Sequence, residues 1–287
     1  MKLLRIGRPG AERPAAQPDD GRVVDLGDEV TDFDGAFFAT GGLDRVRRLL
    51  AEAPDELPTV DLAGKRVGPP IAPPSKIVAI GLNYADHVAE QGARMPSEPE
   101  VFFKAPNTLV GPTDDVLRPV GSTKLDYEVE LAVVIGRPAR YLPDEDAARS
   151  AIAGLAVAND VSERAFQLER GRQWTKGKSC ETFNPLGPWL VTLDEVDDPQ
   201  NLGMWLTVNG EVRQQSNTKE MIAGVFELVR YLSQFMVLEP GDLVDTGTPG
   251  GVALAMDPPR YLQVGDVVEL GIEGLGQQRL RIAPATV

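Results

Sequence analysis

Polar and apolar residues alternate most clearly over residues 126–136, where the apolar, β-branched second half predicts a strand. Because side chains alternate along a strand, Asp126, Glu128 and Glu130 are expected on one face. Beyond them, residues 132–135 place apolar groups on both faces, which is typical of a buried strand. Buried carboxylates are costly unless a positive charge compensates them. A divalent cation held by these oxygens is therefore favoured over the alternative, a solvated edge strand.

Other apolar runs also predict strands, and Asn209-Gly210 between two of them predicts a tight hairpin turn. The predicted strands cover residues 76–81, 101–104, 152–158, 188–192, 204–208, 267–272 and 278–282. Few helices are predicted: a short one over 82–90 with Asn83 as its N-cap, and one long amphipathic helix that begins at Thr218. The chain is therefore predicted to be β-rich, in the α+β class.

The first 70 residues differ from the rest, with short strand-like pieces and a helix-like segment over 43–52. Proline and glycine at 68–70 and 73–74 cannot continue a helix or a central strand, so they indicate a boundary. We predict a small N-terminal domain over residues 1–70 and a catalytic domain over residues 71–287.

Composition narrows the function classes. The chain has 29 basic and 43 acidic residues and a net charge of −14, which argues against nucleic acid or an anionic membrane as a partner. Its one cysteine, Cys180, excludes an intramolecular disulfide framework and multi-cysteine metal sites. The N-terminal residues lack the apolar core of a signal peptide, and no run is long enough to cross a membrane. We expect a cytoplasmic protein.

His87, the only histidine, is a candidate general base. It follows a predicted strand end, and Glu90 lies three residues later on the same helix face, where its carboxylate can orient the imidazole. Asp160 also follows an apolar strand, either as a third carboxylate for the acidic strand or as a turn residue. Phosphate-loop, dinucleotide-binding and serine-hydrolase motifs are absent from the sequence.

Several of these stretches, taken together, resemble the fumarylacetoacetate hydrolase family. The resemblance covers about residues 70–283 and is carried, in order, by Gly81-Leu82-Asn83-Tyr84-Ala85-Asp86-His87, Phe103-Lys104, Asp126-Tyr127-Glu128-Val129-Glu130-Leu131, Asn159-Asp160-Val161-Ser162, Gly177-Lys178-Ser179 and Gly247-Thr248-Pro249-Gly250-Gly251-Val252. It implies a mixed β-roll rich in antiparallel pairs, with a small N-terminal domain, and a homodimer.

The resemblance also implies roles for individual residues. Glu128, Glu130 and Asp160 match the carboxylate ligands of Mg²⁺ or Mn²⁺, with Lys178 beside the ion. His87 and Glu90 match a dyad that activates water. Residues that match positions near the ion or the substrate are Lys104, Arg164, Gln167 and Thr248. Cys180 and Glu181 depart from the usual aromatic residue and aspartate, which bears on the choice of substrate.

The implied reaction is hydrolysis of a carbon–carbon bond in a 2,4-dioxo acid, which gives pyruvate and a second acid. The segment 174–192 looks most like the branch that cleaves 2,4-diketo-3-deoxy sugar acids, and acylpyruvates are the other substrate class considered. Oxaloacetate decarboxylation and 2-hydroxydienoate isomerisation are alternatives on the same metal site. A non-catalytic, ligand-binding member of the fold is a further alternative.

Overall fold

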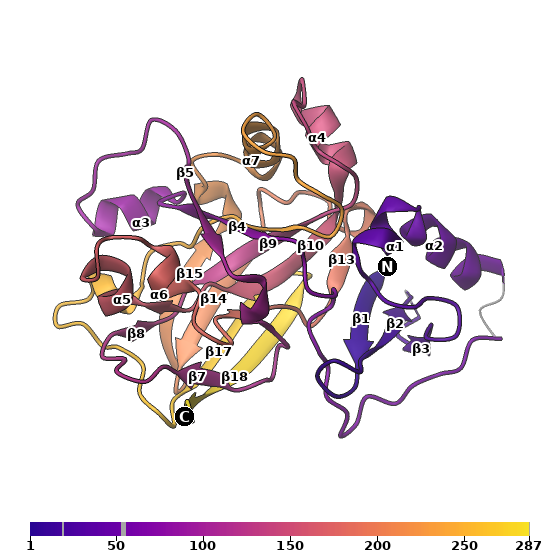
Figure 1. The fold of residues 1–287 in the computed structure, drawn as a ribbon, viewed down its shortest axis with the longest axis horizontal. Coiled ribbons are helices and arrows are strands. Elements are labelled where there is room, and N and C mark those ends of the chain that lie inside the picture. Colours follow the sequence, from indigo (N-terminus) through magenta and orange to yellow (C-terminus); the bar gives the residue numbers. More distant parts are fainter. Residues whose placement is uncertain (19, 53–55, 287) are drawn as a thin grey trace.

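A nine-stranded mixed sheet crosses the centre of the molecule (Figure 1). The structure is a computed structural model that describes residues 1–18, 20–52 and 56–286. In spatial order the strands are β3 (Val24–Asp25), β2 (Arg13–Gln17), β1 (Lys2–Ile6), β13 (Leu190–Thr192), β10 (Ile152–Asn159), β9 (Val129–Ile135), β16 (Leu243–Asp245), β4 (Ile77–Gly81) and β5 (Glu100–Lys104). Among the described strands of this sheet, only β16 and β4 pair in parallel. The predicted β-rich class is confirmed.

A five-stranded sheet packs against the first through a shared apolar core. Its strands are, in spatial order, β15 (Glu211–Asn217), β14 (Gly203–Val208), β17 (Val267–Ile272), β18 (Gly276–Pro284) and β7 (Val116–Arg118). The predicted hairpin is confirmed: β14 and β15 meet at Asn209 and Gly210, whose φ angles of 52° and 79° suit such a turn. Two short pairs join β11 (Ser162–Glu163) to β8 (Leu125–Asp126) and β12 (Asn184–Pro185) to β6 (Leu109–Val110).

The helices are short and lie around the sheets (Figure 1). They are α1 (Gly35–Ala39), α2 (Gly42–Glu52), α3 (Ala85–Glu90), α4 (Glu145–Ala151), α5 (Arg164–Leu168), α6 (Thr175–Lys178) and α7 (Val225–Leu232), with 3-10 turns at Pro106–Thr108, Leu193–Glu195, Thr218–Glu220 and Ala253–Ala255. α4 and α7 add apolar residues to the shared core, whereas α3, α5 and α6 gather beside β5 and β8. None of the helices within the described residues has the length and apolarity that crossing a bilayer requires.

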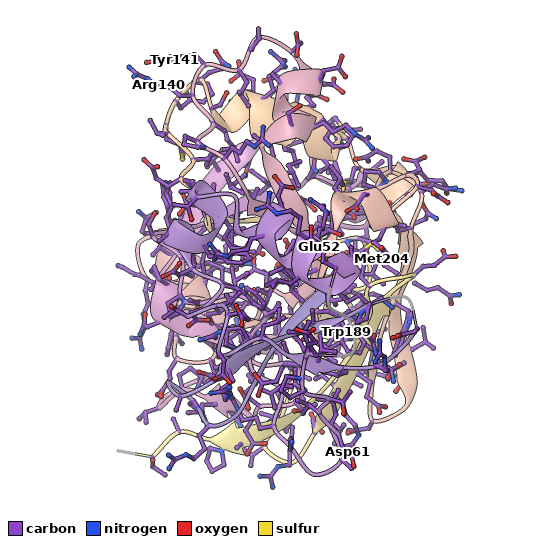
Figure 2. The ribbon with its side chains drawn as sticks, turned by 90° about the vertical axis from the view of Figure 1, so that its right-hand side faces the viewer. Glu52, Asp61, Arg140, Tyr141, Trp189 and Met204 are labelled. Atoms are coloured by element: carbon purple, nitrogen blue, oxygen red, sulfur yellow. The ribbon has the colours of Figure 1, made fainter. Side chains whose placement is uncertain are left out.

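The N-terminal segment continues the large sheet, because β1 pairs with β13. Phe33, Phe37 and Val46 from the α1–α2 region join a second apolar core with residues of β9 and β10. Trp189 lies where this segment meets the rest of the chain, and the Lys2 ammonium stands 5.6 Å from its ring centre (Figure 2). The division at residue 70 stays a prediction.

Three sequence expectations were wrong in detail. The strand expected over 126–136 is broken, because β8 pairs with β11 whereas β9 pairs with β10 and β16. The helix expected from Thr218 begins at Val225, after a separate 3-10 turn. Asn83 does not cap α3; its buried amide donates to the carbonyls of Ala223 and Thr246. In each case, tertiary partners outweighed a local preference.

Candidate metal centre and active site

The ends of three neighbouring strands bring the predicted carboxylates together. β9 and β10 are antiparallel, so the start of β9 lies beside the end of β10, and the Asp160 N–H donates to the Glu128 carbonyl at 2.9 Å. β16 is antiparallel to β9 on its other side, which brings Gly247 N–H to the Glu130 carboxylate at 2.8 Å. The site is therefore built where three central strands of the large sheet begin or end.

Glu128, Glu130 and Asp160 form a compact group of oxygen ligands. One carboxylate oxygen from each lies within 4.8 Å of the others, and all three residues are buried. Ligands on opposite sides of a Mg²⁺ ion are about 4.2 Å apart, since each lies at about 2.1 Å. One Glu130 oxygen accepts from Gly247, and the other has no hydrogen-bond donor within the described residues. The donor set and its spacing fit a hard divalent cation.

Three buried cations neutralise part of this cluster. Lys178 Nζ donates to Glu128 and to Asp160, at 2.6 Å each, and Lys104 pairs with the other oxygen of Asp160. Arg164 donates to Glu128 Oε1 at 2.5 Å. Its Nε donates at 2.9 Å to Asp126, whose carboxylate also accepts backbone N–H groups at Tyr127, Ala253 and Leu254. Asp126 therefore anchors a loop instead of pointing into the site.

Two further carboxylates of the cluster have no ion-pair partner in the described part of the chain. They are Glu130 and Asp245, the last residue of β16, which lies opposite Ala132. Within the described residues, neither oxygen of the fully buried Asp245 has a hydrogen bond, and the amide of nearby Asn184 is also unpaired. The three cations match the charges of Asp126, Glu128 and Asp160, so up to two negative charges remain, which again fits a divalent cation.

The charges separate the proton affinities of the carboxylates. Burial raises the pKa of Glu128, but Lys178 and Arg164 outweigh burial and lower that pKa to about 2. Burial, followed by Asp160 and Asp245, holds the pKa of Glu130 well above its ordinary value. Burial also raises the pKa of Asp245 to about 7. Without a cation, Glu130 therefore retains its proton where Glu128 is ionised.

His87 and Glu90 lie on the same side of α3, as their spacing predicts. His87 is buried, and its Nδ1 lies 2.7 Å from Glu90 Oε1. The other Glu90 oxygen accepts Gly251 N–H at 2.8 Å, which fixes the carboxylate to the glycine-rich loop. Because an ionised carboxylate only accepts, Nδ1 carries a proton, and in the neutral imidazole the lone pair is then on Nε2.

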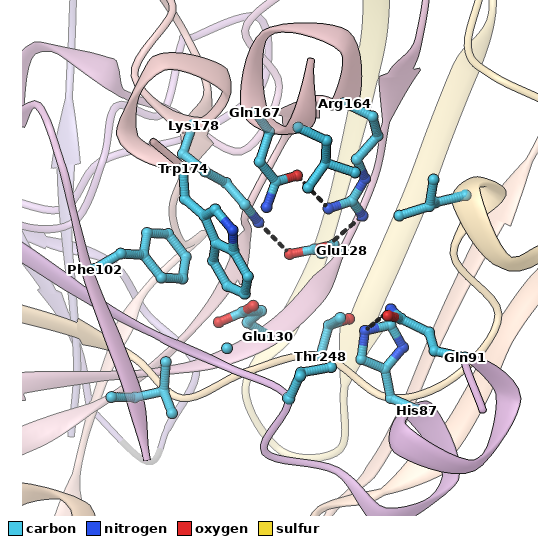
Figure 3. Close-up of a pocket in the computed structure, with 15 residues that line it drawn as sticks. His87, Gln91, Phe102, Glu128, Glu130, Arg164, Gln167, Trp174, Lys178 and Thr248 are labelled. Carbon is cyan, nitrogen blue, oxygen red and sulfur yellow. Dashed lines mark hydrogen bonds and ion pairs between the residues drawn. The ribbon is translucent and has the colours of Figure 1, made fainter. Parts of the chain in front are cut away.

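One pocket joins the acidic group to the dyad (Figure 3). Its cavity volume is about 110 Å³, well below the roughly 300–1,000 Å³ typical of pockets for drug-sized ligands. Glu128, Glu130, Lys178 and His87 line it, and Trp174 packs edge-on against Phe102 at one wall, with ring centres 5.3 Å apart. The pocket thus combines charged groups with an aromatic wall and suits a small ligand.

The four residues predicted near the ion or substrate are not equivalent. Arg164, Gln167 and Thr248 line the pocket, and Arg164 Nη1 donates to Gln167 at 3.0 Å. The Thr248 hydroxyl donates to the Val129 carbonyl at 2.9 Å, so it supports β9. Lys104 lies behind the pocket, where it bonds Asp160 and the Phe183 carbonyl. The substrate-binding roles of all four remain predictions, as do the metal-binding and catalytic roles.

Sequence reasoning gave no role to Gln91, Phe102, Trp174, Asn184 or Asp245. Asp245 carries the signal that singled out Asp160, an acid directly after an apolar strand. The aromatic pair brings together residues 72 positions apart, and no local pattern predicts such a contact.

Comparisons with known proteins show which family this chain resembles. Residues 76–283 match the model of the fumarylacetoacetate (FAA) hydrolase C-terminal family. A Burkholderia multivorans protein, named only as a candidate hydrolase, is 50% identical over 279 residues, which are 97% of each chain.

Solved structures of related enzymes superimpose along the whole chain. Fumarylacetoacetate hydrolase from Exiguobacterium antarcticum is 34% identical, with a TM-score of 0.85 and 99% and 100% of the two chains covered. The 2-hydroxyhepta-2,4-diene-1,7-dioate isomerase from Mycobacterium marinum is 31% identical, with a TM-score of 0.75 and 100% of each chain covered. Maleylpyruvate hydrolase from Sphingobium sp. SYK-6, in complex with manganese(II) and pyruvate, is 26% identical, with a TM-score of 0.81 and 100% of each chain covered. With this fold and a match over most of its length, the chain belongs to the fumarylacetoacetate hydrolase family.

Proposed function

We propose that this protein is a Mg²⁺- or Mn²⁺-dependent hydrolase that cleaves the C3–C4 bond of a 2,4-dioxo acid and releases pyruvate and a second acid. The observation that carries the proposal is the shared pocket: Glu128 and Glu130 of the buried carboxylate trio line the same small cavity as His87, which Glu90 orients. The manganese and pyruvate bound to the related maleylpyruvate hydrolase support this choice of cofactor and product.

Glu128, Glu130 and Asp160 would hold the cation, and Lys178 would keep two of these carboxylates in place through its 2.6 Å bonds. A bound divalent cation would supply Lewis-acid polarisation of the 2-oxo acid group and charge for its orientation. The Lys178 ammonium adds a fixed positive charge close to where the reaction develops negative charge.

The dyad would supply the proton chemistry. His87 Nε2 takes a proton from water while Glu90 accepts the Nδ1–H bond and stabilises the imidazolium. The hydroxide adds to C4, the C3–C4 bond breaks, and its electron pair stays on C3. The imidazolium then returns the proton to C3, so one water and one dioxo acid give pyruvate and a carboxylic acid.

The pocket lining favours a compact, apolar acyl tail. Phe102, Trp174, Leu168 and Leu254 contribute apolar side chains, whereas most polar side chains of the lining are already hydrogen-bonded to one another. A polyol tail would lose hydrogen bonds to water against such a wall. We therefore favour acylpyruvates over diketo-deoxy sugar acids, the branch to which segment 174–192 shows most resemblance.

Pyruvate release from a panel of acids tests the proposal. The panel contains acetylpyruvate, a 2,4-diketo-3-deoxy sugar acid and oxaloacetate, each with Mg²⁺, Mn²⁺ or EDTA. Metal-dependent release from acetylpyruvate, lost in His87→Ala, is expected. Absence of release from every dioxo acid would overturn the proposal, and faster cleavage of the sugar acid would overturn the preference for an apolar tail.

Isomerisation of a 2-hydroxydienoate is the second candidate, because a structure named as such an isomerase superimposes on the whole chain. Oxaloacetate decarboxylation would use the same carboxylates. Neither reaction consumes water, so either activity should largely survive in His87→Ala, whereas hydrolysis should not. The homodimer implied by the family stays a proposal that light scattering after size-exclusion chromatography would test.

A further inference from the structure

The side-chain amide of Gln91 lies within hydrogen-bond distance of His87 Nε2, the ring nitrogen that the proposed hydrolysis needs. Gln91 is the first residue after α3, and its amide nitrogen lies 2.8 Å from His87 Nε2 at the pocket wall (Figure 3). Glu90 Oε1 lies 2.7 Å from Nδ1 and already fixes a proton on that nitrogen. Nε2 of the neutral ring is then an acceptor, and the Gln91 amide is placed to donate to it. Both ring nitrogens are therefore engaged.

The two partners of His87 differ in how firmly they are held. Glu90 is tied to the glycine-rich loop through its second oxygen and Gly251 N–H. Asp86 adds bonds from Gly250 N–H and the Ser216 hydroxyl, which hold α3 in place. The exposed Gln91 side chain, in contrast, has no hydrogen bond except the one to His87 within the part of the chain that the structure describes. A change of the Gln91 rotamer alone would free Nε2 and leave the rest of the dyad intact.

Resting on the function proposed above, we propose that Gln91 is a positioning residue that caps the lone pair of His87 and releases it when substrate and water fill the pocket. A water molecule cannot give its proton to Nε2 while the amide donates to the same lone pair. A neutral hydrogen bond contributes a net 0.5–1.5 kcal/mol at most sites, so the cap should lower the reactivity of Nε2 by about twofold to tenfold.

Chemical modification of His87 tests the cap without any substrate. Diethylpyrocarbonate acylates a free, neutral imidazole nitrogen, and with a single histidine in the chain the ultraviolet absorbance of the acylated imidazole reports His87 alone. The reaction is run on the full chain at pH 8. The variant Gln91→Met keeps the bulk of the side chain but removes the amide. Its modification rate should exceed that of the native protein by about twofold to tenfold. Gln91→Glu offers only acceptors, favours a proton on Nε2 and should slow modification.

A spectroscopic measurement separates hydrogen bonding from shielding by bulk. In protein labelled with ¹⁵N-histidine, only His87 contributes side-chain signals. The Nε2 resonance is expected to move in Gln91→Met, and the Nδ1–H resonance is expected to stay. Equal Nε2 shifts in the native and Met proteins, or equal modification rates in native, Met and Glu proteins, would overturn the cap.

These results are independent of the proposed function. A confirmed cap in a protein that releases no pyruvate from any dioxo acid would refute the hydrolase and leave the cap standing. Pyruvate release from a dioxo acid, together with an Nε2 resonance that does not change in Gln91→Met, would support the hydrolase and refute the cap. In an active enzyme the cap also predicts that Gln91→Met changes kcat more than KM, because the cap acts on the base and not on the substrate.

Discussion

Glu90 binds His87 Nδ1 at 2.7 Å with one carboxylate oxygen and the backbone of the glycine-rich loop with the other. The orientation of the imidazole therefore depends on a loop that follows β16, more than 150 residues further along the chain. This link explains how a six-residue helix can hold a base in a defined position.

Loss of either dyad residue should strongly slow hydrolysis without loss of the metal site. General base catalysis contributes about 10²–10⁴-fold, so His87→Ala should lower kcat by at least about 10²-fold, and Glu90→Gln by on the order of tenfold to 10²-fold. Pyruvate release measures the effect, and a thermal shift with Mn²⁺ serves as the control for metal binding. Full activity in His87→Ala would rule out His87 as the base.

Metal binding should strengthen as pH rises. The pKa of Glu130 lies well above its ordinary value because of burial and the neighbouring Asp160, so the cation must displace a proton. Below that pKa, affinity for Mn²⁺ should rise by up to about tenfold per pH unit for each proton displaced. Calorimetry at pH 5.5 and pH 8 measures this dependence.

Glu130→Gln should remove the calorimetric signal, and the exposed Glu181→Gln should keep it. Unchanged Mn²⁺ affinity in Glu130→Gln would show that the cation binds elsewhere.

Asp245→Asn should stabilise the metal-free protein at pH 8. Burial raises the pKa of Asp245 from 3.8 to about 7. The stability that its protonated form provides is complete below about pH 4 and is lost as pH rises through 7. An asparagine has no such loss, so the gain in free energy of unfolding at pH 8 should be on the order of a few kcal/mol and should be small at pH 4. Urea unfolding in EDTA at the two pH values measures it.

Asp242→Asn is the matched control for Asp245→Asn. Asp242 is also fully buried, but it accepts hydrogen bonds from the Ser75 hydroxyl and from two backbone N–H groups, and it pairs with Lys76. Its replacement should therefore destabilise the protein at pH 8. A loss of stability in both variants would contradict the assignment of Asp245 as an unpaired charge.

Gly81→Ala should disturb the aromatic wall. A Cβ at this position would lie 2.4 Å from Cζ3 of Trp174, so the indole ring must shift. KM for acylpyruvates should rise several-fold with a smaller change in kcat, because the wall binds the tail and not the reacting carbon. Gly203→Ala, where the nearest heavy atom would be 3.4 Å away, is the control. Equal KM values in both variants would place the tail away from Trp174.

The sequence by itself determined what depends on local spacing. Alternation along the expected strand predicted that Glu128 and Glu130 lie together, and a three-residue interval on a helix predicted His87 beside Glu90. The motifs also indicated the family, and their order along the chain was sufficient for that, because family membership does not require knowledge of contacts.

Only the tertiary structure decided which acids face the pocket and which partners they find. Asp126 belongs to the same acidic row in sequence, but it pairs with Arg164 and accepts hydrogen bonds from a distant loop, because the strand is interrupted between β8 and β9. The unpaired charge of Asp245 and the Phe102–Trp174 wall arise where separate segments meet. Even the Gln91 cap, four residues from His87, depends on a rotamer at the end of a helix. Such contacts depend on packing and on the removal of water, which no local pattern encodes.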